Sequence, residues 1–232
     1  MERFFRRSSM RRARVAVTLA RSAILGASVV ALLGSPAAAE GRRFEGSVSR
    51  LDRATRQLMI GSSWHEGCPV ELRELRRVRL TYRGFDGEPH RGRLVVHRRW
   101  ADEILEVFRR LYRRDFPIRR VRLVDRYGGD DRESMRHDNT SAFNCRTVAG
   151  TTTWSQHAYG RAVDLNPVEN PYVEGSRVRP RRGRRFLDRT NVRPGMIVKG
   201  DVVWRAFRRI DWGWGGSWRP AKDYQHFSAN AR

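Results

Sequence analysis

The alternation of apolar and polar residues predicts a β-hairpin in the first half of the chain. Val78 and Leu80 alternate with polar neighbours within residues 76–82, which is the pattern of a strand with one buried face. A Gly-Phe-Asp-Gly turn follows at residues 84–87, and a second apolar stretch covers residues 91–96. Two such stretches around a glycine-containing turn indicate paired antiparallel strands.

Two amphipathic helices and one further strand are predicted downstream. Apolar residues recur at helical spacing from 100 to 112, and Pro117 comes soon after, where a helix is expected to have stopped. The apolar residues within 118–124 predict a strand. Asp201 precedes a second helical pattern over residues 202–210 and is a candidate N-cap.

The remaining segments have weaker patterns. We expect residues 40–67 to be a loosely ordered lead-in with one short strand near residues 57–60, and residues 174–200 to be a long surface loop or lid. Strands and helices alternate without a βαβ rhythm. The sequence therefore predicts an α+β fold with a small antiparallel sheet and flanking helices.

The N-terminal residues have the organisation of an export signal. Residues 1–21 contain seven arginines and one acidic residue, an apolar run follows over residues 23–34, and small residues fill positions 35–39. This order is typical of a secretory signal peptide, so we predict a signal over residues 1–39 and no stable membrane anchor after its cleavage. A retained membrane anchor is the alternative, and the export route is left open between the general and twin-arginine pathways.

Composition limits the classes of protein to consider. The chain has 232 residues, 48 Lys+Arg against 25 Asp+Glu, a formal charge of +23 and 39% hydrophobic residues. This is too apolar for a disordered basic tail. The charge indicates either a solvated surface or attraction to an anionic cell wall. Nucleic acid is not expected as a partner, because the chain has an export signal.

Only two cysteines are present, which excludes a small disulfide scaffold and a four-cysteine zinc finger. In an oxidising compartment Cys68 and Cys145 are expected to form a disulfide. Two separate buried thiols are the alternative.

The first cluster with catalytic potential is Ser-x-His-x-x-Gly-x-Ala-x-Asp, which runs from Ser155 to Asp164. His157 and Asp164 are seven positions apart, so a regular strand would point them to opposite faces. A turn at Gly160 would bring the two side chains together.

The second cluster is Asp223-Tyr-Gln-His226, with the acid and the histidine three residues apart. One helical turn or a bulged strand places both on one side. Two histidines and one carboxylate are a ligand set for catalytic zinc, which keeps its fourth position open. This set leaves Asp223 as a general base beside the metal.

These paired motifs resemble the signature of zinc D-alanyl-D-alanine carboxypeptidases and L-alanyl-D-glutamate endopeptidases, the peptidoglycan peptidases with the Hedgehog/DD-peptidase fold. The resemblance covers roughly residues 65–232 and implies a zinc peptidase domain over residues 68–232. It implies one catalytic Zn²⁺ held by His157, Asp164 and His226.

The resemblance also implies a catalytic role for Asp223 and a substrate-binding arginine, for which Arg146 is the best match. A guanidinium there can hold a substrate carboxylate or stabilise a developing oxyanion; one more surface arginine is the alternative. Ser155 is expected either to contact substrate or to shape the turn.

The sequence does not determine which peptide bond of the substrate is cut. Asp at position 223 resembles the endopeptidases, whereas the run from Asn144 to Pro171 resembles the carboxypeptidases. We therefore predict a secreted, wall-associated zinc peptidase of peptidoglycan stem peptides, in the first place a D-alanyl-D-alanine carboxypeptidase. The alternatives are an endopeptidase of the same fold, a non-catalytic wall-binding module and, disfavoured by the export signal, a nucleic-acid-binding protein.

Overall fold

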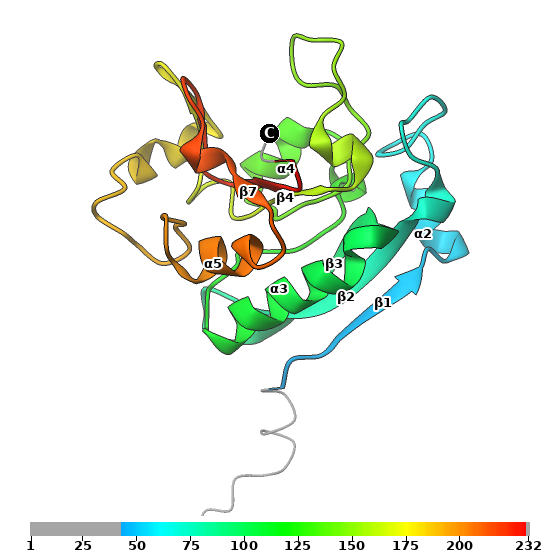
Figure 1. Ribbon diagram of the computed structural model, residues 1–232, viewed down its shortest axis with the longest axis horizontal. Coiled ribbons are helices and arrows are strands. Elements are labelled where there is room, and N and C mark those ends of the chain that lie inside the picture. Colours follow the sequence, from blue (N-terminus) through cyan, green and yellow to red (C-terminus); the bar gives the residue numbers. More distant parts are fainter. Residues whose placement is uncertain (1–42, 231–232) are drawn as a thin grey trace, which may run out of the picture. The chain divides into compact units, whose positions relative to one another are not determined.

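A three-stranded antiparallel sheet contains the predicted hairpin. In the computed structural model, which describes residues 43–230, β2 (Leu75–Arg83) pairs with β3 (Pro89–His97) along its whole length. β1 (Gly46–Arg50) pairs with the other edge of β2, giving the order β1–β2–β3 (Figure 1). Leu80 is buried on the inner face of the sheet. The hairpin prediction is confirmed.

The segment before the hairpin is more regular than its sequence indicated. β1 extends the sheet, and residues 57–60 do not form the predicted strand because α2 spans Arg53–Met59. The carboxylate of Asp52 accepts a hydrogen bond from the backbone N–H of Thr55 and so caps this helix. Thr55 and Met59 are buried, whereas Leu58 is exposed. A capped helix burying one apolar side chain thus takes the place of a short apolar strand.

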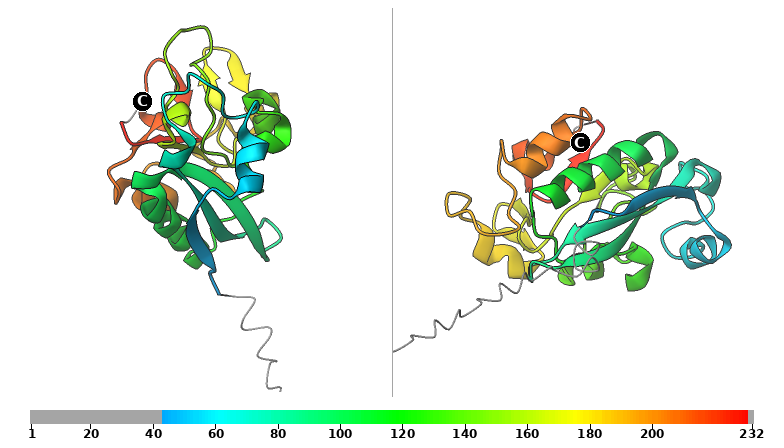
Figure 2. Two further views of the ribbon diagram at one scale, coloured as in Figure 1. Left: turned by 90° about the vertical axis from the view of Figure 1, so that its right-hand side faces the viewer. Right: turned by 90° about the horizontal axis from the view of Figure 1, so that it is seen from below.

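Both predicted amphipathic helices are confirmed. α3 spans Ala101–Arg113 and lies against β2, and its other side contacts α5 (Val202–Arg208), as the two views of Figure 2 show. The side chain of Asp201 accepts a hydrogen bond from the N–H of Trp204 at 2.7 Å, as expected of the predicted N-cap.

The prediction of a strand over residues 118–124 is wrong. Val121 makes only an isolated bridge to Thr140, and the chain then enters a short 3-10 helix. The apolar side chains here are buried, but the backbone runs without a continuous strand partner. Helix α4 follows over Asp131–Arg136.

Two small antiparallel sheets build the C-terminal part. One has the order β4–β9–β7 and the other the order β6–β5–β8. Their strands are β4 (Ala162–Asp164), β5 (Tyr172–Glu174), β6 (Arg177–Arg179), β7 (Gly213–Trp214), β8 (Lys222–Asp223) and β9 (His226–Ser228). Short 3-10 helices occupy Leu72–Glu74, Arg98–Trp100, Val124–Tyr127, Gln156–Tyr159, Arg181–Phe186 and Gly215–Ser217.

The segment predicted as a loop over residues 174–200 is partly regular. It begins at the end of β5, contains β6 and a 3-10 helix, and becomes irregular after Phe186. The guanidinium of Arg189 donates hydrogen bonds to the carbonyls of Glu169 and Ile197 and to the side chain of Asn170. These bonds fasten the irregular part to the segment that follows β4.

One hydrophobic core joins the sheet β1–β2–β3 to the sheet β4–β9–β7. Phe207 of α5 stacks on Phe227 of β9 with ring centroids 4.1 Å apart, and Trp212 is fully buried beside them. The same core includes residues of β2, β3 and α3. The strands that carry the candidate site are therefore packed directly on the core, and the mixed arrangement of helices and antiparallel sheets confirms the α+β class.

A disulfide joins Cys68 to Cys145, with 5.9 Å between their Cα atoms, so the predicted pairing is confirmed. His65 lies beside these sulfur atoms, but both thiols are used in the disulfide. This group therefore does not offer a metal-ligand set.

No helix among residues 43–230 combines the length and apolar character needed to cross a bilayer. The predicted signal over residues 1–39 lies outside the described residues.

Candidate metal centre

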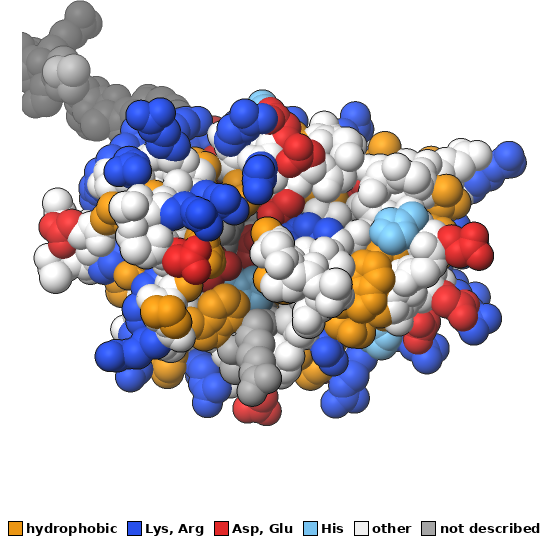
Figure 3. Space-filling model, turned by 90° about the horizontal axis from the view of Figure 1, so that it is seen from above, with side chains coloured by type: hydrophobic (Ala, Val, Ile, Leu, Met, Phe, Trp, Pro, Cys, Tyr) orange, Lys and Arg blue, Asp and Glu red, His pale blue; other side chains and the backbone are white. Residues whose placement is uncertain are grey.

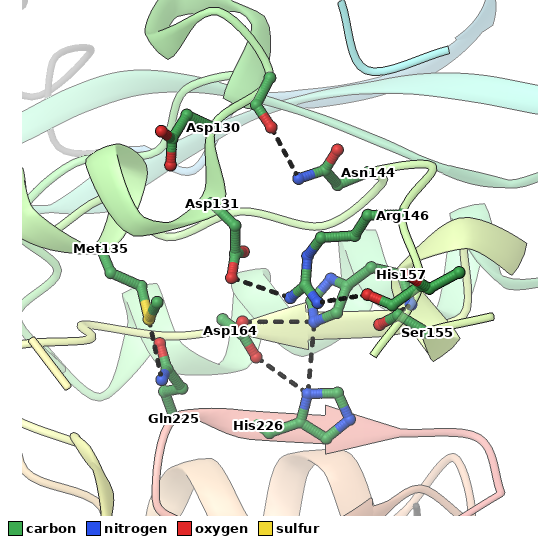
Figure 4. Close-up of polar contacts among 12 residues, drawn as sticks. Asp130, Asp131, Met135, Asn144, Arg146, Ser155, His157, Asp164, Gln225 and His226 are labelled. Carbon is green, nitrogen blue, oxygen red and sulfur yellow. Dashed lines mark hydrogen bonds and ion pairs between the residues drawn. The ribbon is translucent and has the colours of Figure 1, made fainter. Parts of the chain in front are cut away.

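Three buried side chains converge from three segments of the chain. His157 comes from the 3-10 helix Gln156–Tyr159, Asp164 ends β4 and His226 begins β9 (Figure 4). The Nε2 atom of His157 lies 3.2 Å from Oδ2 of Asp164, and Nδ1 of His226 lies 3.0 Å from Oδ1. All three are at most 5% exposed. The structure thus brings together the three residues predicted as ligands.

A capped turn places His157 opposite Asp164. The Oγ atom of Ser155 accepts a hydrogen bond from the N–H of His157, and Gly160 ends the turn at φ 62°. A Cβ on Gly160 would lie 2.6 Å from the backbone nitrogen of His97, so both the left-handed conformation and the close approach require glycine. The turn reverses the chain before β4, so His157 and Asp164 do not lie on one regular strand. Their side chains can therefore face each other although they are seven residues apart.

The hydrogen bonds of His157 determine which of its nitrogens faces the cluster. Its Nδ1 atom lies 2.5 Å from the carbonyl oxygen of Ala142, which can only accept. Nδ1 therefore carries the proton, and Nε2 presents its lone pair towards Asp164 and His226. A backbone acceptor behind a ligating histidine is a usual support of a metal site.

The arrangement fits a metal ion. The Nε2 atom of His157 and the Nδ1 atom of His226 are only 3.3 Å apart and both face Asp164. Burial acts to raise the pKa of Asp164, but the two histidines outweigh it and hold that pKa well below its usual range. Two imidazole nitrogens and an ionised carboxylate are a donor set that Zn²⁺ accepts.

Asp223 lies beside this cluster on β8 rather than on the same element as His226. Burial and the negative charge of Asp164 raise the pKa of Asp223 to about 7. Its Oδ1 atom is buried and has no hydrogen-bond partner among the described residues. The prediction that one helical turn or bulged strand carries Asp223 and His226 is wrong, because β8 and β9 belong to different sheets.

Close packing against Gly215 holds Asp223 and His226 together. A Cβ on Gly215 would lie 2.6 Å from the carbonyl oxygen of Asp223 and 3.3 Å from Cβ of His226. No side chain other than hydrogen fits there. The glycines between the tryptophans were visible in the sequence, but nothing in their spacing indicated this contact.

Arg146 forms an ion pair with Asp131, with 3.0 Å between Nη2 and Oδ2. Its segment lies beside the His157 turn, because the N–H of Ser155 donates to the carbonyl of Arg146 and the N–H of Asn144 donates to that of His157. Figure 4 shows Arg146 extending from this segment towards Asp131. Sequence reasoning missed Asp131, which is one of many acids in the chain and has no motif spacing.

Two further residues lie beside the site. Gln225 is buried, and its side-chain amide lowers the pKa of Asp223, against the larger effect of burial. Trp218 lies against His226, with ring centroids 5.2 Å apart. The position of Gln225 between Asp223 and His226 was the signal available in the sequence.

One face of the molecule is mixed in charge. Figure 3 shows a hollow whose floor carries acidic and histidine side chains, with Lys and Arg side chains distributed over the surrounding face.

The comparisons with known proteins point to one family. A family model described as D-alanyl-D-alanine carboxypeptidase matches residues 149–229. No curated protein and no solved structure matches the chain. The matched segment contains all three candidate ligands and Asp223, and it begins after Arg146. The match supports the resemblance seen in the sequence: residues 149–229 are similar to the D-alanyl-D-alanine carboxypeptidase family.

Proposed function

We propose that the protein is an exported zinc peptidase that cleaves peptidoglycan stem peptides, and specifically a D-alanyl-D-alanine carboxypeptidase. The observation that carries the proposal is the meeting of His157, Asp164 and His226 in one buried cluster, with the buried Oδ1 of Asp223 unpartnered beside it. The family match supports peptidase chemistry at this cluster.

His157, Asp164 and His226 would hold the zinc ion, each through one atom. When bound, zinc supplies a Lewis acid that lowers the pKa of water towards about 7 and polarises a carbonyl group. Ser155 shapes the turn that presents His157, through the hydrogen bond from the His157 N–H. We also propose that Ser155 contacts the substrate.

Asp223 is the proton carrier in this mechanism. With a pKa raised to about 7, its carboxylate accepts a proton from the attacking water while the water oxygen bonds to the scissile carbonyl carbon. It then returns the proton to the departing amine nitrogen as the C–N bond breaks. The partnerless Oδ1 atom is the acceptor available for this transfer.

Arg146 is the proposed partner of the scissile carbonyl. A guanidinium donates directional hydrogen bonds, which strengthen as negative charge develops on the carbonyl oxygen. The carbonyl of Arg146 accepts a hydrogen bond from the N–H of Ser155, which lies two residues before His157. This bond keeps the backbone of Arg146 close to the turn that carries His157.

Export and wall association complete the proposal. The Cys68–Cys145 disulfide suits an oxidising compartment, and the peptidase family suits a substrate outside the cytoplasm. Cleavage of residues 1–39, which contain seven arginines and one glutamate, lowers the formal charge from +23 to +17. This charge would attract the protein to an anionic wall.

The experiment that tests this function is product analysis by mass spectrometry. The zinc-loaded protein is incubated with a stem pentapeptide and with crosslinked muropeptides, in parallel with His157→Ala. Loss of one alanine from the pentapeptide, absent in the variant, supports the carboxypeptidase. Cleavage elsewhere in the stem indicates the endopeptidase. No cleavage with zinc confirmed bound refutes the enzyme and favours a wall-binding module.

A further inference from the structure

The carboxylate of Asp131 is held in place by its own helix. Asp131 is the first residue of α4, and Asp130 before it caps the helix by accepting a hydrogen bond from the N–H of Glu133. The side chains of Asp131 and Arg146 are 23% and 29% exposed, so their ion pair is largely shielded from water. Shielding strengthens an ion pair relative to one at an open surface.

The backbone just before Arg146 is fastened by several contacts. The side-chain amide of Asn144 donates to the carbonyl of Gly129, just before α4. The N–H of Cys145 donates to the carbonyl of Ser63, and Cys145 is linked to Cys68. These contacts restrict movement of the Arg146 backbone. The direction of the guanidinium then depends on the contacts of the side chain. Its Nη1 atom lies 3.5 Å from the carbonyl oxygen of Thr147, and Asp131 is the carboxylate that pairs with Nη2.

Resting on the proposed function, we propose that Asp131 is a positioning residue that also determines specificity. It orients Arg146 towards the scissile carbonyl and balances its positive charge. A balanced guanidinium still donates hydrogen bonds to a neutral carbonyl, including one that gains negative charge during the reaction. It is a poor receptor for a substrate carboxylate, because that group would lie beside the like charge of Asp131.

This assignment has a direct consequence for substrate recognition. The terminal carboxylate of a D-alanyl-D-alanine substrate has to be bound by a cation other than Arg146. Removal of the charge of Asp131 frees Arg146, which then binds that carboxylate and moves away from the carbonyl. The variant is expected to bind a substrate with a free terminal carboxylate more tightly. Its kcat is expected to fall, because Arg146 no longer contacts the scissile carbonyl.

The test uses two substrates that differ only in their C-terminal group. Both are the same stem peptide ending in D-alanyl-D-alanine, one as the free carboxylate and one as the carboxamide, so the scissile bond is identical. The kcat and KM for both substrates are measured with the unaltered full chain and with the single variants Asp131→Asn, Asp130→Asn and Arg146→Gln. The double variant Arg146→Gln with Asp131→Asn is measured as well. Asp130→Asn is the matched control, since it alters the same helix end without touching Arg146.

For Asp131→Asn we expect the KM of the carboxylate to fall and kcat on the carboxamide to fall, each about tenfold, the size of one partly shielded charge interaction. The ratio of kcat/KM for the two substrates then shifts towards the carboxylate. Asp130→Asn leaves the ratio unchanged, and in the Arg146→Gln background Asp131→Asn has no effect on it. A ratio that does not move in Asp131→Asn, while the unaltered protein cleaves, overturns this inference and leaves the proposed function standing.

Equilibrium binding provides the second measurement. The same two peptides are titrated by calorimetry into Asp223→Asn, with and without Asp131→Asn, so that no turnover is needed. Tighter binding of the carboxylate alone supports the inference. An unchanged preference overturns it, and absence of both binding and cleavage in every form overturns it together with the proposed function.

Discussion

Asp164 and His226 face each other directly across the antiparallel pair β4–β9, and their side chains meet at 3.0 Å. Residues opposite each other in such a pair point to the same face of the sheet. Two residues 62 positions apart are thus placed together by a ladder only three residue pairs long. The neighbouring Phe227 is fully buried in the core, so the register of this short ladder is anchored by packing.

We predict that Asp164→Asn loses the metal. The substitution keeps the shape of the side chain but removes the charge that both histidines face. Replacing a supporting residue of a metal site weakens affinity by about 10–100-fold, and a direct ligand should cost at least as much. Zinc content after dialysis against a weak chelator measures the effect. Retention of one zinc per chain would remove Asp164 from the ligand set.

Asp223→Asn is expected to keep zinc and lose turnover. The amide cannot accept the proton of water, and general-base catalysis contributes about 10²–10⁴-fold to a rate. The measurement is kcat on a cleaved stem peptide together with zinc content. Turnover near that of the unaltered protein would show that another group carries the proton.

Gly160→Ala should destabilise the protein and disturb the cluster. A left-handed conformation costs a non-glycine residue about 1–2 kcal/mol. The contact with the nitrogen of His97, at 2.6 Å, adds overpacking of about 1–3 kcal/mol. Gly175→Ala is the matched control, since φ is 54° there and its Cβ would meet no atom within 4 Å. Denaturant unfolding of both variants separates the two contributions. Equal losses of stability would show that the turn tolerates the methyl group.

Stability is expected to depend on pH through Glu169. Burial, with the nearby carboxylate of Asp138, raises the pKa of Glu169 from 4.5 to about 8. The folded state therefore binds this proton more tightly than the unfolded state. The contribution of Glu169 to the free energy of unfolding is full below about pH 4.5 and is lost as pH rises towards 8.

Urea unfolding between pH 5 and 8 tests this dependence. In Glu169→Gln the decline should be smaller than in the unaltered protein, because the amide does not ionise. Glu174→Gln, at an exposed position, serves as the control and should decline like the unaltered protein. Identical pH profiles for all three proteins would contradict the prediction.

Removal of the disulfide should lower stability by about 2–4 kcal/mol. The bond closes a loop with a sequence separation of 77, which restricts the unfolded chain. The double variant Cys68→Ser with Cys145→Ser is compared with the unaltered protein by thermal and denaturant unfolding. Zinc content is expected to stay unchanged, because neither cysteine belongs to the cluster. An unchanged midpoint would show that the bond adds no stability.

The sequence by itself determined those helices and strands whose buried faces show as a periodic pattern of apolar residues. The alternation around Val78 and Leu80 predicted the hairpin, and the helical spacing from 100 to 112 predicted α3. The motifs around His157 and His226 indicated the candidate ligands and the resemblance to the peptidase family. These features were readable because side-chain periodicity and ligand type are written in consecutive residues.

Where the pattern was short, the tertiary structure decided otherwise. Ile118, Val121 and Val124 are buried, but their segment lacks a continuous strand partner. Residues near 57–60 belong mostly to a capped helix instead of a strand. Apolar composition reports that a segment is buried. It does not report whether the backbone finds a neighbour to pair with.

The assembly of the site was also decided by the tertiary structure. β4 and β9 bring Asp164 to His226, Gly215 lets Asp223 approach from a different sheet, and α4 brings Asp131 to Arg146. Each of these contacts joins residues far apart in the chain. Their proximity depends on how the strands and helices pack on the common core, and no local pattern of residues encodes that arrangement.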